Sequence, residues 1–124
     1  MTLDELAATL PNGFHDAHVA GVHIDYTSRV MTLDVDLWIG SDSEPEARRP
    51  VRLVLNGLQF CVIEPPDTNY DYASAKALWT SDVVEPPSHV KLPTPRDPNA
   101  FIGSFFVNQW NAFIHLAATD ASLA

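Results

Sequence analysis

Strict alternation of apolar and polar residues over positions 22–39 is the feature that most limits how this chain can fold. Successive side chains of a β-strand point to opposite faces, so this alternation predicts strands with one buried face. An α-helix is excluded here because the apolar positions recur at every second residue. Two arms share the predicted inward face, which carries Val22, Ile24, Tyr26, Met31, Leu33, Val35, Leu37 and Ile39.

The four residues 26–29 predict the reversal between these two arms. Pairing Asp25 with Val30 then brings the two apolar sets onto one side of the hairpin. A shift of one residue would turn one set toward water, so the pattern also predicts the register. In that register the inward pairs are Ile24 with Met31 and Val22 with Leu33.

The outer face of this hairpin is mostly polar and contains Asp34 and Asp36. Their D-x-D spacing is used by some metal-dependent transferases to hold a cation. An antiparallel sheet with one solvated face produces the same pattern, and we favour that interpretation.

Two later regions also have the pattern of strands. Within 51–63 the alternation changes phase at Asn56-Gly57, which predicts either a hairpin turn or a glycine bulge in one long strand, and we favour the bulge. The segments 101–107 and 112–118 flank an amide-rich turn and predict a second hairpin. In that hairpin His115 is expected to be a hydrogen-bonded sheet residue.

The remaining segments are expected to be less regular. Residues 2–9 predict a short helix, because Thr2 and Glu5 have the capping-box spacing and Pro11 follows. Residues 64–100 hold seven of the ten prolines and predict a long ordered excursion across one sheet face, with one short helix at 73–79. Residues 119–124 are expected to fray.

The fold predicted for residues 1–124 is therefore a single, mainly β domain, α+β at the margin. We expect a twisted antiparallel sheet, curled or sandwich-like, with a short N-terminal helix and a long proline-rich ordered loop at 64–100.

The formal charge of −9, from 16 acidic and 7 basic residues, argues against binding to nucleic acid or to an anionic membrane. It favours a basic protein partner instead. The chain has no basic N-terminal region followed by an apolar stretch and no apolar run long enough to span a membrane, which predicts a cytoplasmic protein. Its single cysteine, Cys61, lies in an apolar run and is expected to be an inert core thiol.

The most chemically active cluster in the sequence is His15, Asp16 and His18. Imidazole and carboxylate groups are metal ligands, so these three residues are candidates for a metal or ligand site. The H-x-x-H spacing, however, differs from the i, i+4 spacing of helical zinc sites. We favour a structural role in which Phe14 anchors the turn in the core and Asp16 accepts backbone N–H groups.

No catalytic motif is present, and no cofactor is predicted. The chain lacks a nucleophile elbow, a phosphate-binding glycine loop and any paired-cysteine metal spacing. A set of Ser104, His115 and Asp16 can be assembled on composition alone, but nothing in the sequence supports a mechanism, and an enzyme is not the favoured class.

The residues of 10–17, Leu-Pro-Asn-Gly-Phe-His-Asp-Ala, and the alternating strand after them resemble the opening of a family of small uncharacterised bacterial proteins. Gly57-Leu58-Gln59-Phe60 and the block 106–115 are similar to the same group. More remotely, the chain resembles immunity proteins of polymorphic toxin systems. That resemblance implies a cytoplasmic protein that binds its toxin.

Three functional hypotheses follow. The favoured one is a non-catalytic protein-interaction module, immunity-like, that binds a basic partner. The alternative is a small-ligand or metal-binding protein, and the third is self-association through the apolar terminal hairpin. The candidate binding residues are those of the histidine cluster and four aromatic residues of the later segments: His15, Asp16, His18, Tyr70, Tyr72, Trp79 and Trp110.

Overall fold

The computed structural model describes residues 1–70 and 77–124, and in these ranges the chain forms a mainly antiparallel β structure with one short helix, as predicted. The elements, in chain order, are α1 Leu3–Ala8, β1 His18–Asp25, β2 Val30–Trp38, β3 Arg48–Asn56, β4 Phe60–Ile63, β5 Leu78–Val84, β6 Phe101–Val107, β7 Ala112–Ala118 and β8 Asp120–Leu123.

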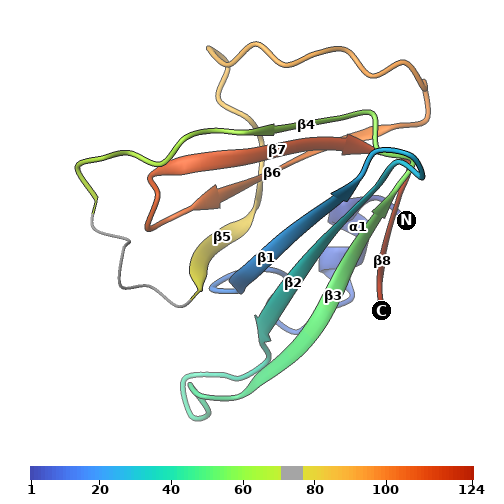
Figure 1. Cartoon of the computed structure of the whole chain (residues 1–124). Coiled ribbons are helices and arrows are strands. Elements are labelled where there is room, and N and C mark those ends of the chain that lie inside the picture. Colours follow the sequence, from blue (N-terminus) through green and yellow to red (C-terminus); the bar gives the residue numbers. More distant parts are fainter. Residues whose placement is uncertain (71–76) are drawn as a thin grey trace.

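The strands form one curled sheet in the order β4-β7-β6-β5-β1-β2-β3-β8, and every neighbouring pair is antiparallel. The curl produces two facing layers, with β1-β2-β3 in one and β4-β7-β6 in the other (Figure 1). β5 joins the layers because it pairs with β1 along one edge and with β6 along the other. The sheet is not closed into a barrel, since β4 and β8 remain its two ends.

The first hairpin has the predicted register. Asp25 pairs with Val30, and residues 26–29 form the turn. Between Val19 and Gly21 the register shifts, so β1 carries a bulge that the alternation did not reveal. The inward face of β2 is fully buried and packs with the inward face of β3 and with the terminal hairpin, through Met31, Leu33, Leu37, Leu53, Leu55, Val107 and Leu116.

The terminal hairpin is also confirmed, with Phe101–Val107 paired to Ala112–Ala118 around a four-residue turn. The prediction that residues 119–124 fray is wrong. Asp120–Leu123 forms β8 and pairs with β3. The physical reason is burial, because Ala121 is only 1% exposed and its backbone N–H donates to the Met1 carbonyl oxygen at 2.8 Å.

The segment 64–100 is more regular than predicted. Within it Leu78–Val84 forms β5, so the helix predicted at 73–79 is wrong for Leu78 and Trp79, and its residues 73–76 lie outside the described ranges. Edge-to-edge pairing with β1 and β6 decides the strand conformation here, since alternation within the segment is weak. The proline-rich remainder, 85–100, runs along the side of β4-β7-β6 that faces away from β1-β2-β3 (Figure 1).

Asn56-Gly57 is neither the hairpin turn nor the glycine bulge that the sequence predicted as alternatives. β3 and β4 do not pair with each other, so the dipeptide is a corner at which the chain leaves one layer and enters the other. Gly57 has a φ of +63°, and a Cβ there would collide with Oγ1 of Thr119. Only glycine fits this backbone conformation without strain.

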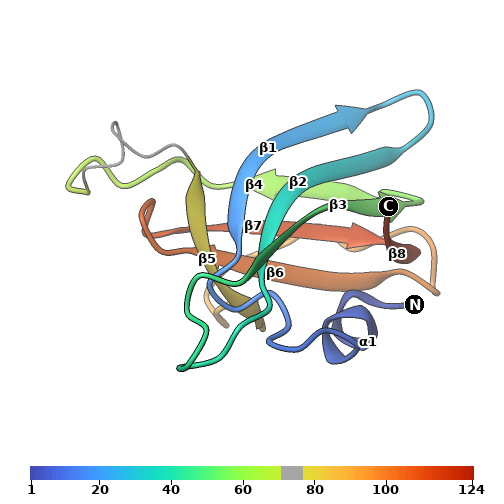
Figure 2. The ribbon, with the colours of Figure 1, turned by 90° about the horizontal axis from the view of Figure 1, so that it is seen from below.

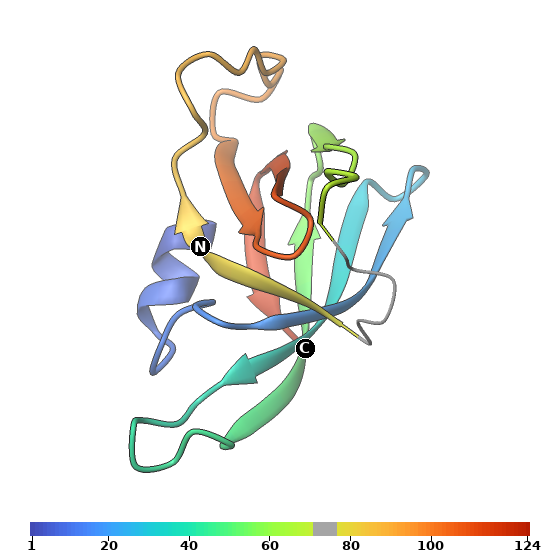
Figure 3. The same ribbon diagram turned by 90° about the vertical axis from the view of Figure 1, so that its left-hand side faces the viewer.

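Helix α1 begins at the predicted capping box, in which Thr2 and Glu5 exchange side-chain-to-backbone hydrogen bonds. It lies beside β6 and β8, on one side of the space between the layers (Figure 3). Leu3 packs so tightly on β6 that a Cβ on Gly103 would lie 2.7 Å from its Cδ2. Figure 2 shows the same helix from below, near both chain ends. Among the described residues no helix has the length and apolar character needed to cross a bilayer.

Candidate functional site

The space between the two layers is open on the side opposite α1. Here β1 and β4 face each other without pairing, and we call this gap, bounded by residues 20–25 and Phe60–Ile63, the open seam (Figure 3). β1 pairs with β5 only at His18 and Val19, and beyond the bulge its second edge has no strand partner among the described residues. Among the strands in 1–70 and 77–124, β4 pairs with β7 alone.

Two hollows lie along the open seam. One, of about 320 Å³, lies between the first half of β1 and the end of β4 and is lined mainly by apolar side chains, including Val22, Ile63, Leu78, Trp110 and Ile114. The other, of about 430 Å³, lies between the end of β1 and the start of β4. Its lining combines apolar residues with two arginines: Ile24, Leu58, Phe60, Cys61, Arg29 and Arg96. Both volumes fall in the range of ordinary ligand pockets.

Apolar side chains at the open seam are unusually exposed. Val22, which the alternation placed on the core face, is 38% exposed, and Ile63 is 43% exposed. Val22 lies on the face that the alternation predicted, but no described strand covers Val22 or Ile63. The prediction that Val22 is buried therefore failed because the two layers do not close at this edge. Tyr26, also expected inward, lies in the turn and is 84% exposed.

The backbone of β4 presents hydrogen-bonding groups to the open seam. The N–H of Glu64 donates to the carbonyl oxygen of Phe113 at 3.0 Å, just beyond the β4–β7 ladder. In an antiparallel pair the residues alternate between facing the partner and facing away. Because Glu64 faces β7, the residues one and three positions before it, Ile63 and Cys61, face away from β7. Their N–H and C=O groups therefore lie on the free edge of β4.

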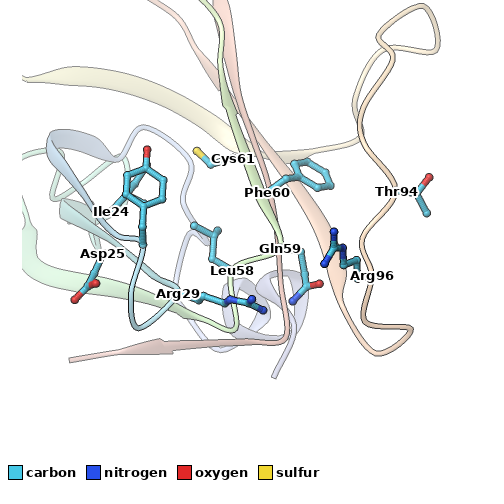
Figure 4. A pocket seen from close by; sticks show the side chains of 10 residues that line it. Ile24, Asp25, Arg29, Leu58, Gln59, Phe60, Cys61, Thr94 and Arg96 are labelled. Carbon is cyan, nitrogen blue, oxygen red and sulfur yellow. The ribbon is translucent and has the colours of Figure 1, made fainter.

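Figure 4 shows how the two arginines lie in the larger hollow. Arg29 comes from the β1–β2 turn and Arg96 from the proline-rich segment, and they extend from opposite sides of β4 toward Gln59. Asp25 points away from them. Its carboxylate accepts the backbone N–H groups of Thr27 and Ser28 at 3.0 and 3.1 Å, and the Ser28 bond is the main cause that holds the pKa of Asp25 below its usual value.

The predicted histidine cluster does not converge on one point. His15 and Asp16 are neighbours, with 3.5 Å between Nε2 and Oδ2, and both are well exposed. His18 instead stacks on Trp79, with ring centroids 4.8 Å apart, and burial, followed by the nearby Arg48 charge, lowers its pKa. Among the residues in 1–70 and 77–124, no three His, Cys, Asp or Glu side chains gather as a metal site would require.

The turn around His15 has the structural role that we favoured, but the carboxylate that accepts a backbone N–H of this turn belongs to another residue than the predicted one. Phe14 is 1% exposed and anchors the turn in the core, as predicted. Its backbone N–H donates to the carboxylate of Asp82 on β5 at 3.2 Å, whereas Asp16 was the predicted acceptor. No local pattern pointed to Asp82, because its role depends on β5 lying beside this turn.

The predicted aromatic residues lie at separate places. Trp110 lines the smaller hollow of the open seam. Trp79 is on β5, where its exposed ring lies between His18 and Arg48, the guanidinium carbon being 5.9 Å from the ring centroid. Tyr70 is exposed at the end of the first described range, and Tyr72 lies outside the described residues.

Ser104 and His115 form a buried pair across β6 and β7, with Ser104 Oγ 2.7 Å from His115 Nδ1. On the other side of the ring, Nε2 lies 3.6 Å from a carboxylate oxygen of Glu64. A catalytic serine must reach a substrate, but both Ser104 and His115 are fully buried. His115 is therefore the hydrogen-bonded sheet residue that the sequence predicted, and Asp16 has no part in this group.

Taken together, the fold and the open seam define a class: a small, curled antiparallel β-sheet that leaves two strand edges unpaired above an apolar groove. Scans against family models, curated proteins and solved structures found nothing that matches this chain. Its function must therefore be argued from the seam itself.

Proposed function

We propose that this protein is a non-catalytic protein-interaction module that binds an extended segment of a partner chain in the open seam. The observation that supports the proposal is a pair of strand edges, on β1 and β4, that have no strand partner among residues 1–70 and 77–124. They face each other across two hollows, the smaller of which is lined mainly by apolar side chains. In this mode of recognition the partner adds a strand to the sheet, and backbone hydrogen bonds supply much of the affinity.

The free edge of β4 supports this proposal because its own residues do not protect it from pairing. Natural proteins usually protect an edge strand with charged residues, proline or a covering segment. Phe60–Ile63, with the sequence Phe-Cys-Val-Ile, has neither charge nor proline. The backbone groups assigned to this edge at Cys61 and Ile63 would pair with an added strand.

The side chains of the groove would supply specificity. Val22 and Ile63 are exposed in the free protein and would be covered by the incoming segment. At 20–33 cal/mol per Å² of apolar area removed from water, covering side chains of this size contributes roughly 1–3 kcal/mol each. That is enough for a contact of moderate affinity once the backbone bonds are added.

The net charge of −9 favours a partner that is basic overall, through long-range attraction. A cytoplasmic immunity-like protein that neutralises a basic toxin fits this description. In that case association should slow as salt is added, since screening weakens the attraction of distant charges.

A matched pair of isoleucines tests where the partner binds. Ile63 and Ile102 are both 43% exposed, but Ile63 lies at the open seam and Ile102 on β6, away from it. Extended peptides selected from a random library against the immobilised protein serve as the probe. We expect Ile63→Lys to weaken their binding by at least tenfold and Ile102→Lys to leave it unchanged.

Nuclear magnetic resonance shows the location directly. The amide signals of Cys61 and Ile63 should shift on peptide addition and become protected from hydrogen exchange. If no peptide binds above a scrambled control, or if the two lysine variants weaken binding equally, the proposal is wrong.

A further inference from the structure

We infer that the segment bound in the open seam carries a carboxylate side chain, which Arg29 and Arg96 hold beside Gln59. This inference rests on the proposed function and adds the chemistry of the partner segment. Its starting point is the placement of two cations in one groove of a protein that has only seven basic residues.

Neither guanidinium has a partner in the described part of the chain. Arg48 donates to the carbonyl oxygens of Asp16 and Asp36, and Arg52 pairs with Asp34 at 3.3 Å. By contrast, the side chains of Arg29 and Arg96 make no hydrogen bond or ion pair with any residue in 1–70 or 77–124. Two arginine side chains without a partner among the described residues, both lining one hollow, form a site with an unused binding capacity for an anion.

Hydrogen bonds hold the backbone near both arginines to the same two residues, Leu58 and Gln59. The carbonyl oxygen of Arg29 accepts the N–H of Leu58 at 2.9 Å. On the other side, the N–H of Asp97, directly after Arg96, donates to Oε1 of Gln59 at 3.1 Å. The residue pair Leu58-Gln59, immediately before β4, thus ties down the turn that carries Arg29 and the segment that carries Arg96.

A carboxylate is the anion that fits this position. Guanidinium groups bind carboxylates through paired, charge-assisted hydrogen bonds, which are about twice as strong as neutral ones. A nucleic acid backbone would meet the protein's charge of −9 and be repelled. An acidic side chain on an added strand brings a single negative charge, and it reaches the two arginines while its neighbours cover Ile24 and Phe60.

A second copy of this chain is a poorer occupant. Two copies related by a two-fold axis would bring the same four guanidinium groups to one interface, and each copy carries nine negative charges. A partner that is basic overall is attracted by the net charge of −9, and one acidic residue in its inserted strand can bind Arg29 and Arg96.

The test compares three versions of a peptide selected against the protein, with glutamate, glutamine or lysine at the position nearest Gln59. For the native protein we expect the glutamate peptide to bind at least tenfold more tightly than the glutamine peptide, and the lysine peptide more weakly still. In Arg29→Gln and Arg96→Gln the advantage of glutamate over glutamine should fall to threefold or less. Arg52→Gln, whose side chain lies on β3 and pairs with Asp34, is the matched control and should keep the full advantage.

Cys61 reports the place of binding, because it is the chain's only cysteine and lines the same hollow. Burial raises the pKa of its thiol, so alkylation by iodoacetamide is measured at about pH 9. Bound glutamate peptide should slow this alkylation by at least fivefold.

Equal binding of the glutamate and glutamine peptides would overturn the carboxylate inference while leaving the proposed interaction module intact. Failure of all three peptides to bind would instead overturn the proposed function. Two further results would also overturn the inference: N-acetylglutamate amide binding as tightly as the whole peptide, or a concentration-dependent dimer in sedimentation that Ile63→Lys abolishes.

Discussion

Replacing Gly57 by alanine should destabilise the protein in two separable ways, because this residue forms the corner that carries the chain from β3 to β4. Its φ of +63° lies in the left-handed region, where a Cβ costs about 1–2 kcal/mol. The new methyl group would also collide with Oγ1 of Thr119, and overpacking of this kind costs about 1–3 kcal/mol. Gly57→Ala should therefore lower the free energy of unfolding by roughly 2–5 kcal/mol.

A double-mutant cycle with Thr119→Ala separates the two costs. The second variant removes the hydroxyl that the methyl group would strike, together with a weak 3.3 Å hydrogen bond from Thr119 Oγ1 to the Asn56 carbonyl oxygen. In the Thr119→Ala background, Gly57→Ala should cost less, because only the backbone strain of about 1–2 kcal/mol and a 3.1 Å contact with the remaining Cβ at position 119 are left. Urea denaturation followed by circular dichroism measures all four proteins.

Gly21→Ala is the matched control. Its Cβ would meet only a side-chain oxygen of Asp34 at an ordinary 3.6 Å, so this substitution should change stability by less than about 1 kcal/mol. If the costs of Gly57→Ala and Thr119→Ala simply add, within about 0.5 kcal/mol, the two residues are not in contact and the reasoning about the corner is refuted.

Three further predictions concern the core, the buried Ser104–His115 pair and the titration of His18. Leu33→Ala should cost about 2–5 kcal/mol in urea denaturation, because the side chain is fully buried, whereas Ile102→Ala at an exposed site should cost far less. Ser104→Ala should cost about 1–3 kcal/mol, since it leaves Nδ1 of the buried His115 without its partner, and an unchanged midpoint would contradict this. For His18 the folded-state pKa is lowered, so the unfolded chain binds the proton more readily and stability should fall as the pH drops below about 6.5. His18→Asn should flatten that part of the stability profile measured from pH 7.5 to 5, and an identical slope in both proteins would contradict the assignment.

The sequence predicted those parts of the fold that depend on local pattern. Alternation gave the register of β1 and β2 because a slip would expose Leu33, and the flanked turn gave the terminal hairpin. The capping box located α1. Each of these features is encoded within about 20 consecutive residues.

The remaining parts depend on contacts between distant segments. β5 pairs with β1 and β6, and β8 pairs with β3. Neither strand could be predicted from its own residues, because pairing with distant segments determines its conformation. The open seam was missed for the same reason. Val22 has the pattern of a buried residue, and only the failure of β1 and β4 to meet leaves it exposed. Arg29 and Arg96 are far apart in the sequence, and no motif connects them.

The β1–β5 ladder pairs His18 and Val19 and continues into the turn before β1, where the Thr80 N–H donates to the Ala17 carbonyl oxygen at 2.9 Å. This junction between distant segments has a consequence for folding kinetics. The meander β1-β2-β3 is contiguous in sequence and can nucleate early, whereas the junction with β5 must wait for a long loop to close. Weakening β2 should therefore slow refolding, while weakening the β1–β5 junction should mainly accelerate unfolding.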